Sequence, residues 1–125
     1  MTTYIIDTET TGLNEPEVIE LAVKKLTNLD IGGFHEPPVV SYYRPSKSIE
    51  LGALSTHHIT SEELQDYPPA STARIPEDAE FIIGHNVDFD WTALGSPPGK
   101  RICTQALARM LYPGLDSHKL GALMY

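Results

Sequence analysis

The amino-acid sequence predicts an α/β fold built on a mixed sheet. Three β-branched, apolar segments come first, and after Pro45 strand-like segments alternate with helical ones. A chain of 125 residues with 41% hydrophobic residues is long enough to bury one core. We therefore expect a single domain over residues 1–125, in which an antiparallel meander of three strands precedes alternating helices and strands.

The first half of the chain contains the three strands of the meander. Residues 3–6 are β-branched and aromatic, and a Gly-containing turn follows them closely. Residues 18–26 fit a strand or a helix by periodicity alone, and a strand is favoured because β-branched residues open the segment. A turn is expected over 28–33, and the third strand over 39–43, ahead of an Arg-Pro pair.

The second half predicts the alternating part of the fold. Thr60 to Glu63 has the pattern of a capping box, and a Pro-Gly pair at 113–114 ends another helix. In chain order, the expected elements are helix 49–54, a helix from Thr60 to Tyr67, strand 80–84, helix 85–94, strand 101–103, helix 104–112 and a last helix from Ser117.

Composition excludes several classes of protein. Asp and Glu outnumber Lys and Arg by 17 to 9, a formal net charge of −8, which disfavours a broad basic surface for nonspecific polyanion binding. The single cysteine, Cys103, cannot form an internal disulfide, so a reducing, cytoplasmic location is expected. No apolar run approaches the ~18 residues of a membrane span, so no membrane partner is expected.

Two acids, Asp7 and Glu9, follow the first expected strand directly. Side chains alternate along a strand, so both carboxylates are expected on one face and Thr8 on the other. Like charges this close are unfavourable unless a cation neutralises them. An all-oxygen donor set favours Mg²⁺ or Mn²⁺ over zinc. The alternative is a pair of solvated acids at a strand end.

A second polar cluster follows the apolar segment that ends at Gly84. Asn86 is a suitable helix N-cap, and Asp90 lies one helical turn beyond it on the same face. If the two strand ends are neighbours in the sheet, Asp90 faces Asp7 and Glu9. Three carboxylates could then hold two divalent ions roughly 4 Å apart, an arrangement that activates water in phosphodiester hydrolysis.

Four neighbours of Asp90 carry other expectations. Asp88 points away from the acids and is expected to be solvated, whereas Phe89 and Trp91 are expected to pack in the core. His85 is either a structural imidazole or part of the site.

The two clusters together resemble the motifs of the DnaQ-type 3′ to 5′ exonucleases. Asp7 to Leu13 is similar to the first exonuclease motif, and His85 to Asp90 to the second. The spacing between them and the segments 53–60 and 102–114 most resemble the exodeoxyribonuclease X group.

This resemblance implies a ribonuclease-H-like fold and the release of 5′-mononucleotides from DNA 3′ ends, with single-stranded ends preferred. It makes Asp7, Glu9 and Asp90 the catalytic residues that hold two Mg²⁺ or Mn²⁺ ions. The residues implied at the terminal nucleotide are Thr10, Leu13, His57 and Asn86, with Leu13 as an apolar wedge beside the last base. A surface loop residue without function is the alternative for His57.

The chain departs from the family in the third motif. There a late helix carries a His five residues before an Asp, or a Tyr before an Asp, and the pair supplies the general base and a fourth metal ligand. Here His118 is followed five residues later by Leu123, and the last Asp is Asp116. We therefore expect a C-terminally incomplete member with slow hydrolysis, because a positioned base is typically worth ~10² to 10⁴-fold.

Two other functions stay open at this point. One is a catalytically incomplete module that binds a DNA end or a partner protein, and the other is a 3′ to 5′ exoribonuclease. Without the final helix, an apolar face of the sheet is expected to be uncovered, which would favour low stability or self-association.

Overall fold

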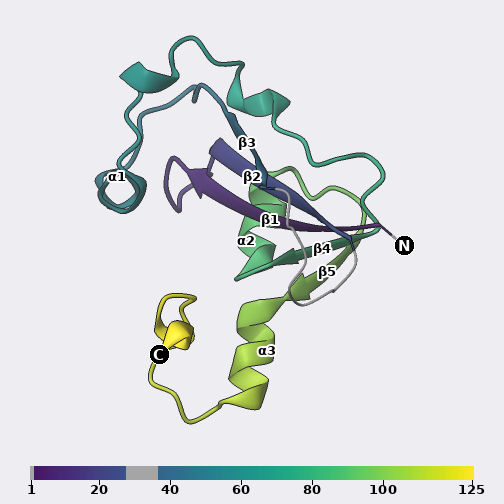
Figure 1. The fold of residues 1–125 in the computed structure, drawn as a ribbon. Coiled ribbons are helices and arrows are strands. Elements are labelled where there is room, and N and C mark those ends of the chain that lie inside the picture. Colours follow the sequence, from purple (N-terminus) through teal and green to yellow (C-terminus); the bar gives the residue numbers. More distant parts are fainter. Residues whose placement is uncertain (1, 28–36) are drawn as a thin grey trace.

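The computed structural model describes residues 2–27 and 37–125, so the expected turn over 28–33 lies outside the described residues. Within them, five strands form a mixed sheet in the order β3-β2-β1-β4-β5 (Figure 1). The strands and α-helices in chain order are β1 (Thr3–Thr10), β2 (Val18–Leu26), β3 (Val39–Tyr42), α1 (Leu51–His57), β4 (Phe81–Gly84), α2 (Val87–Ala93), β5 (Lys100–Cys103) and α3 (Thr104–Leu111).

The central strand β1 joins the two halves of the fold. It pairs antiparallel with β2, which pairs antiparallel with β3, and it pairs parallel with β4, which pairs parallel with β5. The predicted meander followed by alternating helices and strands is therefore confirmed. Because β1 and β4 are parallel neighbours, the residues that follow them lie at one edge of the sheet.

One face of the sheet carries the core. Tyr4 and Ile6 of β1 pack with Ile82 of β4 and Val87 of α2, and all four are at most 8% exposed. Burying one side chain of this size stabilises the fold by about 1.5–3 kcal/mol. Trp91 packs against the edge of this cluster, as expected. The core thus holds α2 against the strands.

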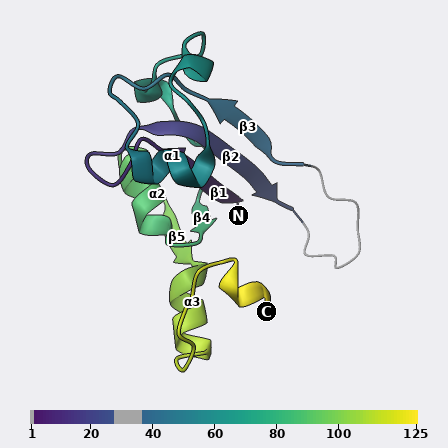
Figure 2. The same ribbon diagram turned by 90° about the vertical axis from the view of Figure 1, so that its left-hand side faces the viewer.

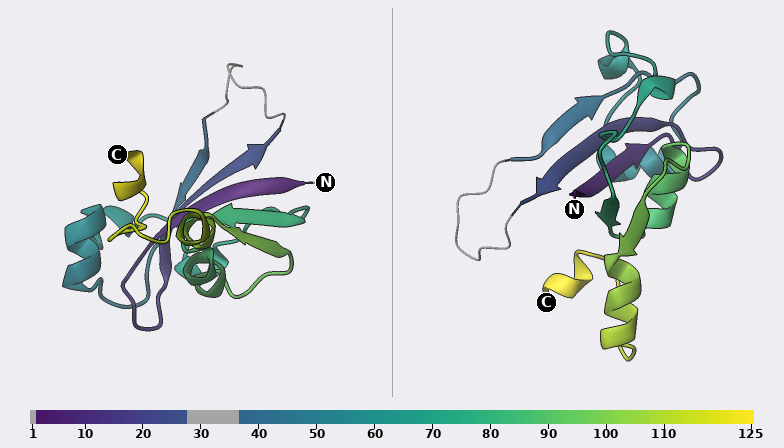
Figure 3. Two further views of the ribbon diagram at one scale, coloured as in Figure 1. Left: turned by 90° about the horizontal axis from the view of Figure 1, so that it is seen from below. Right: turned by 90° about the vertical axis from the view of Figure 1, so that its right-hand side faces the viewer.

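The opposite face of the sheet is more open. Ile5, Ile83 and Ile102 are register partners across β1, β4 and β5, and we call them the isoleucine row. Ile5 is 39% exposed and the other two are half-buried. Seen from below, α2 lies on only one side of the sheet (Figure 3). The structure therefore has an open apolar face of the kind that the sequence predicts.

The remaining helices lie at the margins of the sheet. α1 lies beside the end of β1, and α3 projects beyond the edge strand β5 with the C-terminal segment beside it (Figures 1 and 2). No helix in the described part of the chain has the length and apolar character needed to cross a membrane.

The expected helix from Thr60 to Tyr67 is wrong, because only a 3₁₀ turn forms there, over Glu62–Leu64. The Thr60 hydroxyl oxygen accepts the Glu63 N–H at 3.4 Å, as half of a capping box would. Farther along, the Arg44 guanidinium donates to the Tyr67 carbonyl at 3.3 Å, and two prolines follow directly. A residue before proline is disfavoured in the helical region, so Tyr67 cannot extend the 3₁₀ turn into a longer helix.

The expected helix from Ser117 is also wrong, since the only helical turn there is a 3₁₀ turn at Ala122–Met124. The His118 carbonyl accepts a hydrogen bond from Nε2 of His85 at 2.6 Å, and His118 Nε2 donates to the Tyr112 carbonyl at 2.8 Å. In a continuous helix the His118 carbonyl would accept a hydrogen bond from the next turn, whereas here it accepts one from His85.

Two smaller boundaries differ from expectation. β1 continues to Thr10 instead of ending at residue 6, because β2 offers it pairing partners along its whole length. The expected helix 49–54 begins two residues later and continues to His57. The other strands and helices match their predicted positions within two residues.

Candidate active site

Asp7 and Glu9 lie within the last part of β1 rather than after it. As predicted, they share the open face of the sheet, since they alternate with the core-facing residues. The register then shifts: Glu9 pairs with Glu20, whereas Thr10 pairs with Val18, which leaves one extra residue on β2. Such bulges redirect side chains and are common beside active sites.

A third acid on this face, Glu20 of β2, is absent from the sequence prediction. It lies directly opposite Glu9. It also accepts a hydrogen bond from the Tyr42 hydroxyl, which with the charge of Glu20 raises the pKa of Tyr42. A signal for Glu20 did exist, because an acid inside the apolar run 18–22 is out of place in a buried strand.

Asp90 reaches the same strand from α2 and is 4% exposed. Its Oδ1 accepts the Thr8 N–H at 3.1 Å and the Thr8 hydroxyl at 2.5 Å. The expectation that the ends of β1 and β4 are neighbours is confirmed. Thr8, which strand alternation sends away from Asp7 and Glu9, is the residue that fixes Asp90.

The three predicted ligands all have raised pKa values. Desolvation raises the pKa of Asp7, and the charge of Glu20 adds to the effect. Desolvation also raises the pKa of Glu9, followed by the charges of Asp7, Glu20 and Asp90. For Asp90, desolvation and the charge of Asp7 outweigh the hydrogen bonds from Thr8. A divalent cation would relieve this repulsion, and carboxylate oxygens suit a hard cation.

The ligand set itself stays a prediction. In residues 2–27 and 37–125, no three His, Cys, Asp or Glu side chains converge closely enough to form a complete metal site. The acids are near enough to raise one another's pKa, but their oxygens are not gathered around one point.

The turn after β1 holds two of the residues predicted at the terminal nucleotide. Thr10 is buried, and its hydroxyl donates to the Gly12 carbonyl at 3.0 Å, so this side chain stabilises the turn. Leu13, in contrast, is 85% exposed. Of the two, Leu13 is therefore the side chain that is free to contact a ligand.

His57 connects the end of α1 to the end of β1. Its Nδ1 accepts the Ile59 N–H at 3.0 Å, and its Nε2 donates to the Thr10 carbonyl at 3.1 Å. A carbonyl can only accept, so both bonds require the neutral tautomer with the proton on Nε2. Both nitrogens are thus used inside the chain, and the geometry supports a positioning role rather than direct contact with a nucleotide.

Asn86 occupies the predicted N-cap position of α2 but does not cap the helix with its side chain. Its φ of 61° is left-handed, whereas a capping side chain requires an extended residue. Asn is among the residues that tolerate this conformation. His85 next to it is structural, since Nδ1 meets the Thr104 hydroxyl at 2.9 Å and Nε2 donates to the His118 carbonyl.

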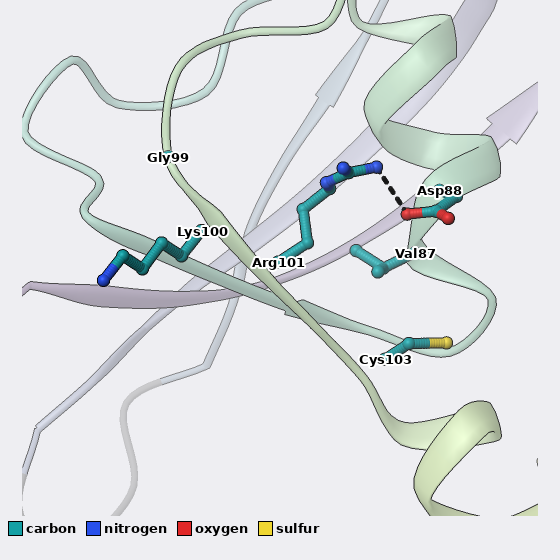
Figure 4. A pocket seen from close by; sticks show the side chains of 6 residues that line it. All are labelled: Val87, Asp88, Gly99, Lys100, Arg101 and Cys103. Carbon is teal, nitrogen blue, oxygen red and sulfur yellow. Dashed lines mark hydrogen bonds and ion pairs between the residues drawn. The ribbon is translucent and has the colours of Figure 1, made fainter.

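A shallow hollow lies on the other side of α2, lined by Val87, Asp88, Gly99, Lys100, Arg101 and Cys103 (Figure 4). Arg101 donates to Asp88 Oδ1 at 2.6 Å, and its guanidinium stacks 3.8 Å from the centre of the Trp91 ring. Asp88 is exposed, as expected, and points away from the three acids. The Arg101 guanidinium is already paired with Asp88 and stacked on Trp91, so the acidic site is the better candidate for the functional site.

Comparison with known proteins gives a context for this geometry. A model of the RNase_T exonuclease family matches residues 4–125. The chain belongs to this exonuclease family. The match includes both strand ends that carry the acids, and it confirms the membership that the two motifs predict.

A curated protein and a solved structure are similar along most of the chain. It is 36% identical over 113 residues to exodeoxyribonuclease 10 of Escherichia coli strain K12, which covers 89% of this chain and 49% of that protein. It is 35% identical to exonuclease X in a solved complex with 5′-overhanging duplex DNA, with a TM-score of 0.75, covering 91% of this chain and 66% of that one. The predicted similarity to exodeoxyribonuclease X and the ribonuclease-H-like fold are confirmed.

A more distant structure extends the fold comparison. The zinc-bound form of the E. coli ExoI complex with single-stranded DNA has a TM-score of 0.70 at 21% identity, covering 98% of this chain and 34% of that one. At this identity the likeness shows the fold alone. The exonuclease family generally uses divalent metal ions. The present chain spans about half the length of its curated relative, at 49%.

Proposed function

We propose that this exonuclease-family chain is a metal-dependent 3′ to 5′ exodeoxyribonuclease domain. It hydrolyses phosphodiester bonds at DNA 3′ ends and releases 5′-mononucleotides. The observation that carries the proposal is the approach of Asp90 to β1, where it is bound by Thr8, the residue between Asp7 and Glu9, and lies near enough for the charges of the three acids to affect one another. Acids on two parallel strand ends are thereby brought to one edge of the sheet.

Asp7, Glu9 and Asp90 are the residues that would hold Mg²⁺ or Mn²⁺, with two ions per site. Their oxygens fit such ions, and their raised pKa values reflect desolvation first and the charges of neighbouring acids second, both of which a bound cation would offset. When bound, the ions would activate water and stabilise the leaving oxygen. Thr8 orients Asp90, and Leu13 offers an exposed apolar side chain to the last base.

DNA is the proposed substrate, with a single-stranded 3′ end preferred. The similarity to exonuclease X, whose solved structure contains 5′-overhanging duplex DNA, supports DNA over RNA. Leu13 supports a frayed or single-stranded end, because an exposed leucine can pack against the apolar face of an unpaired terminal base, which in a duplex is covered by stacking.

The test is the release of mononucleotides from 3′-labelled single-stranded DNA with Mg²⁺ or Mn²⁺. Asp7→Ala is expected to abolish release, and Asp88→Ala to leave it unchanged, because Asp88 lies on the same helix as Asp90 but faces Arg101. Wild-type release should still be slow, since the third motif is absent from residues 1–125 and a positioned base is worth ~10² to 10⁴-fold. Equal release by the wild type and Asp7→Ala would contradict the proposal. A matched RNA oligomer degraded faster than the DNA would change the substrate class.

A second candidate is a noncatalytic module that binds a DNA end or a partner protein. The arrangement of the acids favours it, because those of residues 2–27 and 37–125 do not converge on one point. Metal-dependent binding of a 3′ end without any nucleotide release, lost in Asp7→Ala, would identify this function.

A further inference from the structure

The loop that carries Leu13 is braced by a segment far away in the sequence. This segment, residues 46–50, leads into α1 and lies against residues 11–17. Three contacts join the two segments before Glu50 itself is considered: Ser46 N–H to Glu17 Oε2 at 2.6 Å, the Ser46 hydroxyl to Glu17 Oε1, and Lys47 Nζ to the Asn14 carbonyl at 2.7 Å.

Glu50 adds contacts on both sides of Gly12. Its backbone N–H donates to the Thr11 carbonyl at 2.7 Å, and its carboxylate Oε2 accepts the Leu13 N–H at 2.7 Å. Gly12 has a φ of +152°, and a Cβ placed there would lie 1.5 Å from Glu50 Oε2. The close approach of the carboxylate therefore depends on glycine at this position.

The Glu50 carboxylate binds the Leu13 N–H instead of capping its own helix. Glu50 is the N-cap of α1, yet its side chain makes no capping hydrogen bond. At the other end of the helix, His57 binds the Thr10 carbonyl. α1 has no buried residue of its own, so hydrogen bonds to residues 10–13 are what place it.

Leu13 has a fixed backbone and a free side chain. The N–H is bound by Glu50, and the side chain is 85% exposed. An apolar side chain that is already oriented loses less entropy on contact with a ligand than one on an unrestrained loop.

We propose that Glu50 is a positioning residue that orients Leu13 toward the terminal base of a DNA 3′ end. This inference rests on the proposed function, since it needs the DNA end to lie at Leu13. Glu50 acts on binding through Leu13 and touches neither the scissile bond nor a metal ligand.

The test is a thermodynamic cycle on DNA binding. The probe is a short single-stranded DNA with a 5′ fluorophore and a nonhydrolysable 3′-terminal linkage. Its binding is measured by fluorescence anisotropy in the presence of Mg²⁺. Glu50→Ala is expected to raise the dissociation constant about five- to tenfold, and Leu13→Ala by a similar factor. The double variant should bind no more weakly than Leu13→Ala alone, because the effect of Glu50 passes through that side chain.

Three further variants separate positioning from general damage. Glu50→Gln keeps an acceptor oxygen and should restore binding to within about twofold of the wild type, whereas Glu50→Asp is too short to reach Leu13 and should behave like Glu50→Ala. Glu62→Ala, an exposed acid on the neighbouring 3₁₀ turn, is the matched control and should bind normally.

The outcomes distinguish the two proposals. The positioning role would be overturned if the wild type binds the DNA and both Glu50→Ala and Glu50→Asp bind it with the same affinity. Additive losses of affinity in the double variant would overturn it as well. Either result leaves the proposed function intact. The proposed function, and the role of Glu50 with it, would be overturned if the wild-type chain binds DNA with a free 3′ end no more tightly than the same DNA with its 3′ end blocked by a phosphate.

Discussion

Thr8 shows how a single residue links the two acidic motifs. Strand alternation points Asp7 and Glu9 to the open face, and it leaves the Thr8 hydroxyl free to bind Asp90 at 2.5 Å. A hydrogen bond to a charged group stabilises by about 1.5–3 kcal/mol. The pattern Asp-Thr-Glu is thus more than a pair of ligands, because its middle residue orients the third acid.

The raised pKa of Asp7 predicts how stability depends on pH. A carboxyl group whose pKa is higher in the folded than in the unfolded chain binds more protons when folded, so stability falls as pH rises through that window. The window begins near the ordinary value of 3.8 and extends upward to the raised value. Asp7→Asn removes this unfavourable contribution and should melt at a slightly higher temperature than the wild type at pH 7 in EDTA. The effect stays small because Asp7 is exposed to water.

Thermal unfolding at a series of pH values checks this prediction. The difference between Asp7→Asn and the wild type should grow from acid pH and then remain constant. An Asp7→Asn chain that melts lower than the wild type at neutral pH would show that the Asp7 charge is stabilising, contrary to its pKa.

At this scale the sequence predicted the acids but not their supports. Asp7, Glu9 and Asp90 could be found because carboxylates after apolar strands are conspicuous. Glu50 could not, because its importance depends on which residues lie beside it at the turn, and the acid inside the apolar run that signals Glu20 does not say that Glu9 lies opposite it. Register and long-range contacts of this kind do not leave a local pattern.

Among the elements, α1 is held mainly by hydrogen bonds. Its seven residues include no buried one, and His57 makes two hydrogen bonds, one to the Thr10 carbonyl of β1 and one to the Ile59 N–H just after the helix. His57→Ala should lower the free energy of unfolding by about 1–2 kcal/mol, since each bond contributes about 0.5–1.5 kcal/mol. Urea unfolding measures this loss. His58→Gly is the control: His58 ends the helix with a φ of 59°, so glycine there should leave stability equal or slightly higher. A similar loss of unfolding free energy in both variants would mean that the His57 hydrogen bonds do not stabilise the fold specifically.

Elements that bury apolar side chains in the core were predicted more accurately than elements that do not. β2 was predicted to the residue, since a buried strand needs a run of β-branched and apolar side chains. The helices expected from Thr60 and Ser117 failed because neither forms a buried apolar stripe, and tertiary hydrogen bonds capture their backbone carbonyls instead. Local capping signals can start a turn, but packing decides whether a short helix continues.

For the molecule as a whole, burial is unequal between the two faces of the sheet. The face under α2 holds the main core, and the other carries Asp7, Glu9 and the isoleucine row. A second apolar surface, which we call the α3 surface, lies beyond β5 and consists of Leu107, Met110, Leu111, Tyr112, Leu115 and Leu120, each at least 46% exposed. Water contact with so many large apolar side chains is unfavourable, and monomers rarely leave such a patch uncovered.

We therefore expect the 13.8 kDa chain to self-associate through the α3 surface. The α3 surface is favoured over the isoleucine row because Met110 and Leu111 are 77% and 71% exposed, against 39% for Ile5. Sedimentation equilibrium should show an average mass that rises with concentration. Met110→Glu combined with Leu111→Glu should keep the chain monomeric without lowering its melting temperature, because both side chains are already in water and the added charges repel across the contact.

Two matched variants decide which surface is responsible. Leu51→Glu makes the same kind of change at an exposed leucine of α1, 82% exposed and outside both surfaces, and it should associate like the wild type. Ile5→Glu places a charge in the isoleucine row. If Ile5→Glu abolishes association and the double variant on α3 does not, the open face of the sheet is the contact surface. In that case the acids beside Ile5 would be covered in the associated form, and DNA binding should weaken as protein concentration rises.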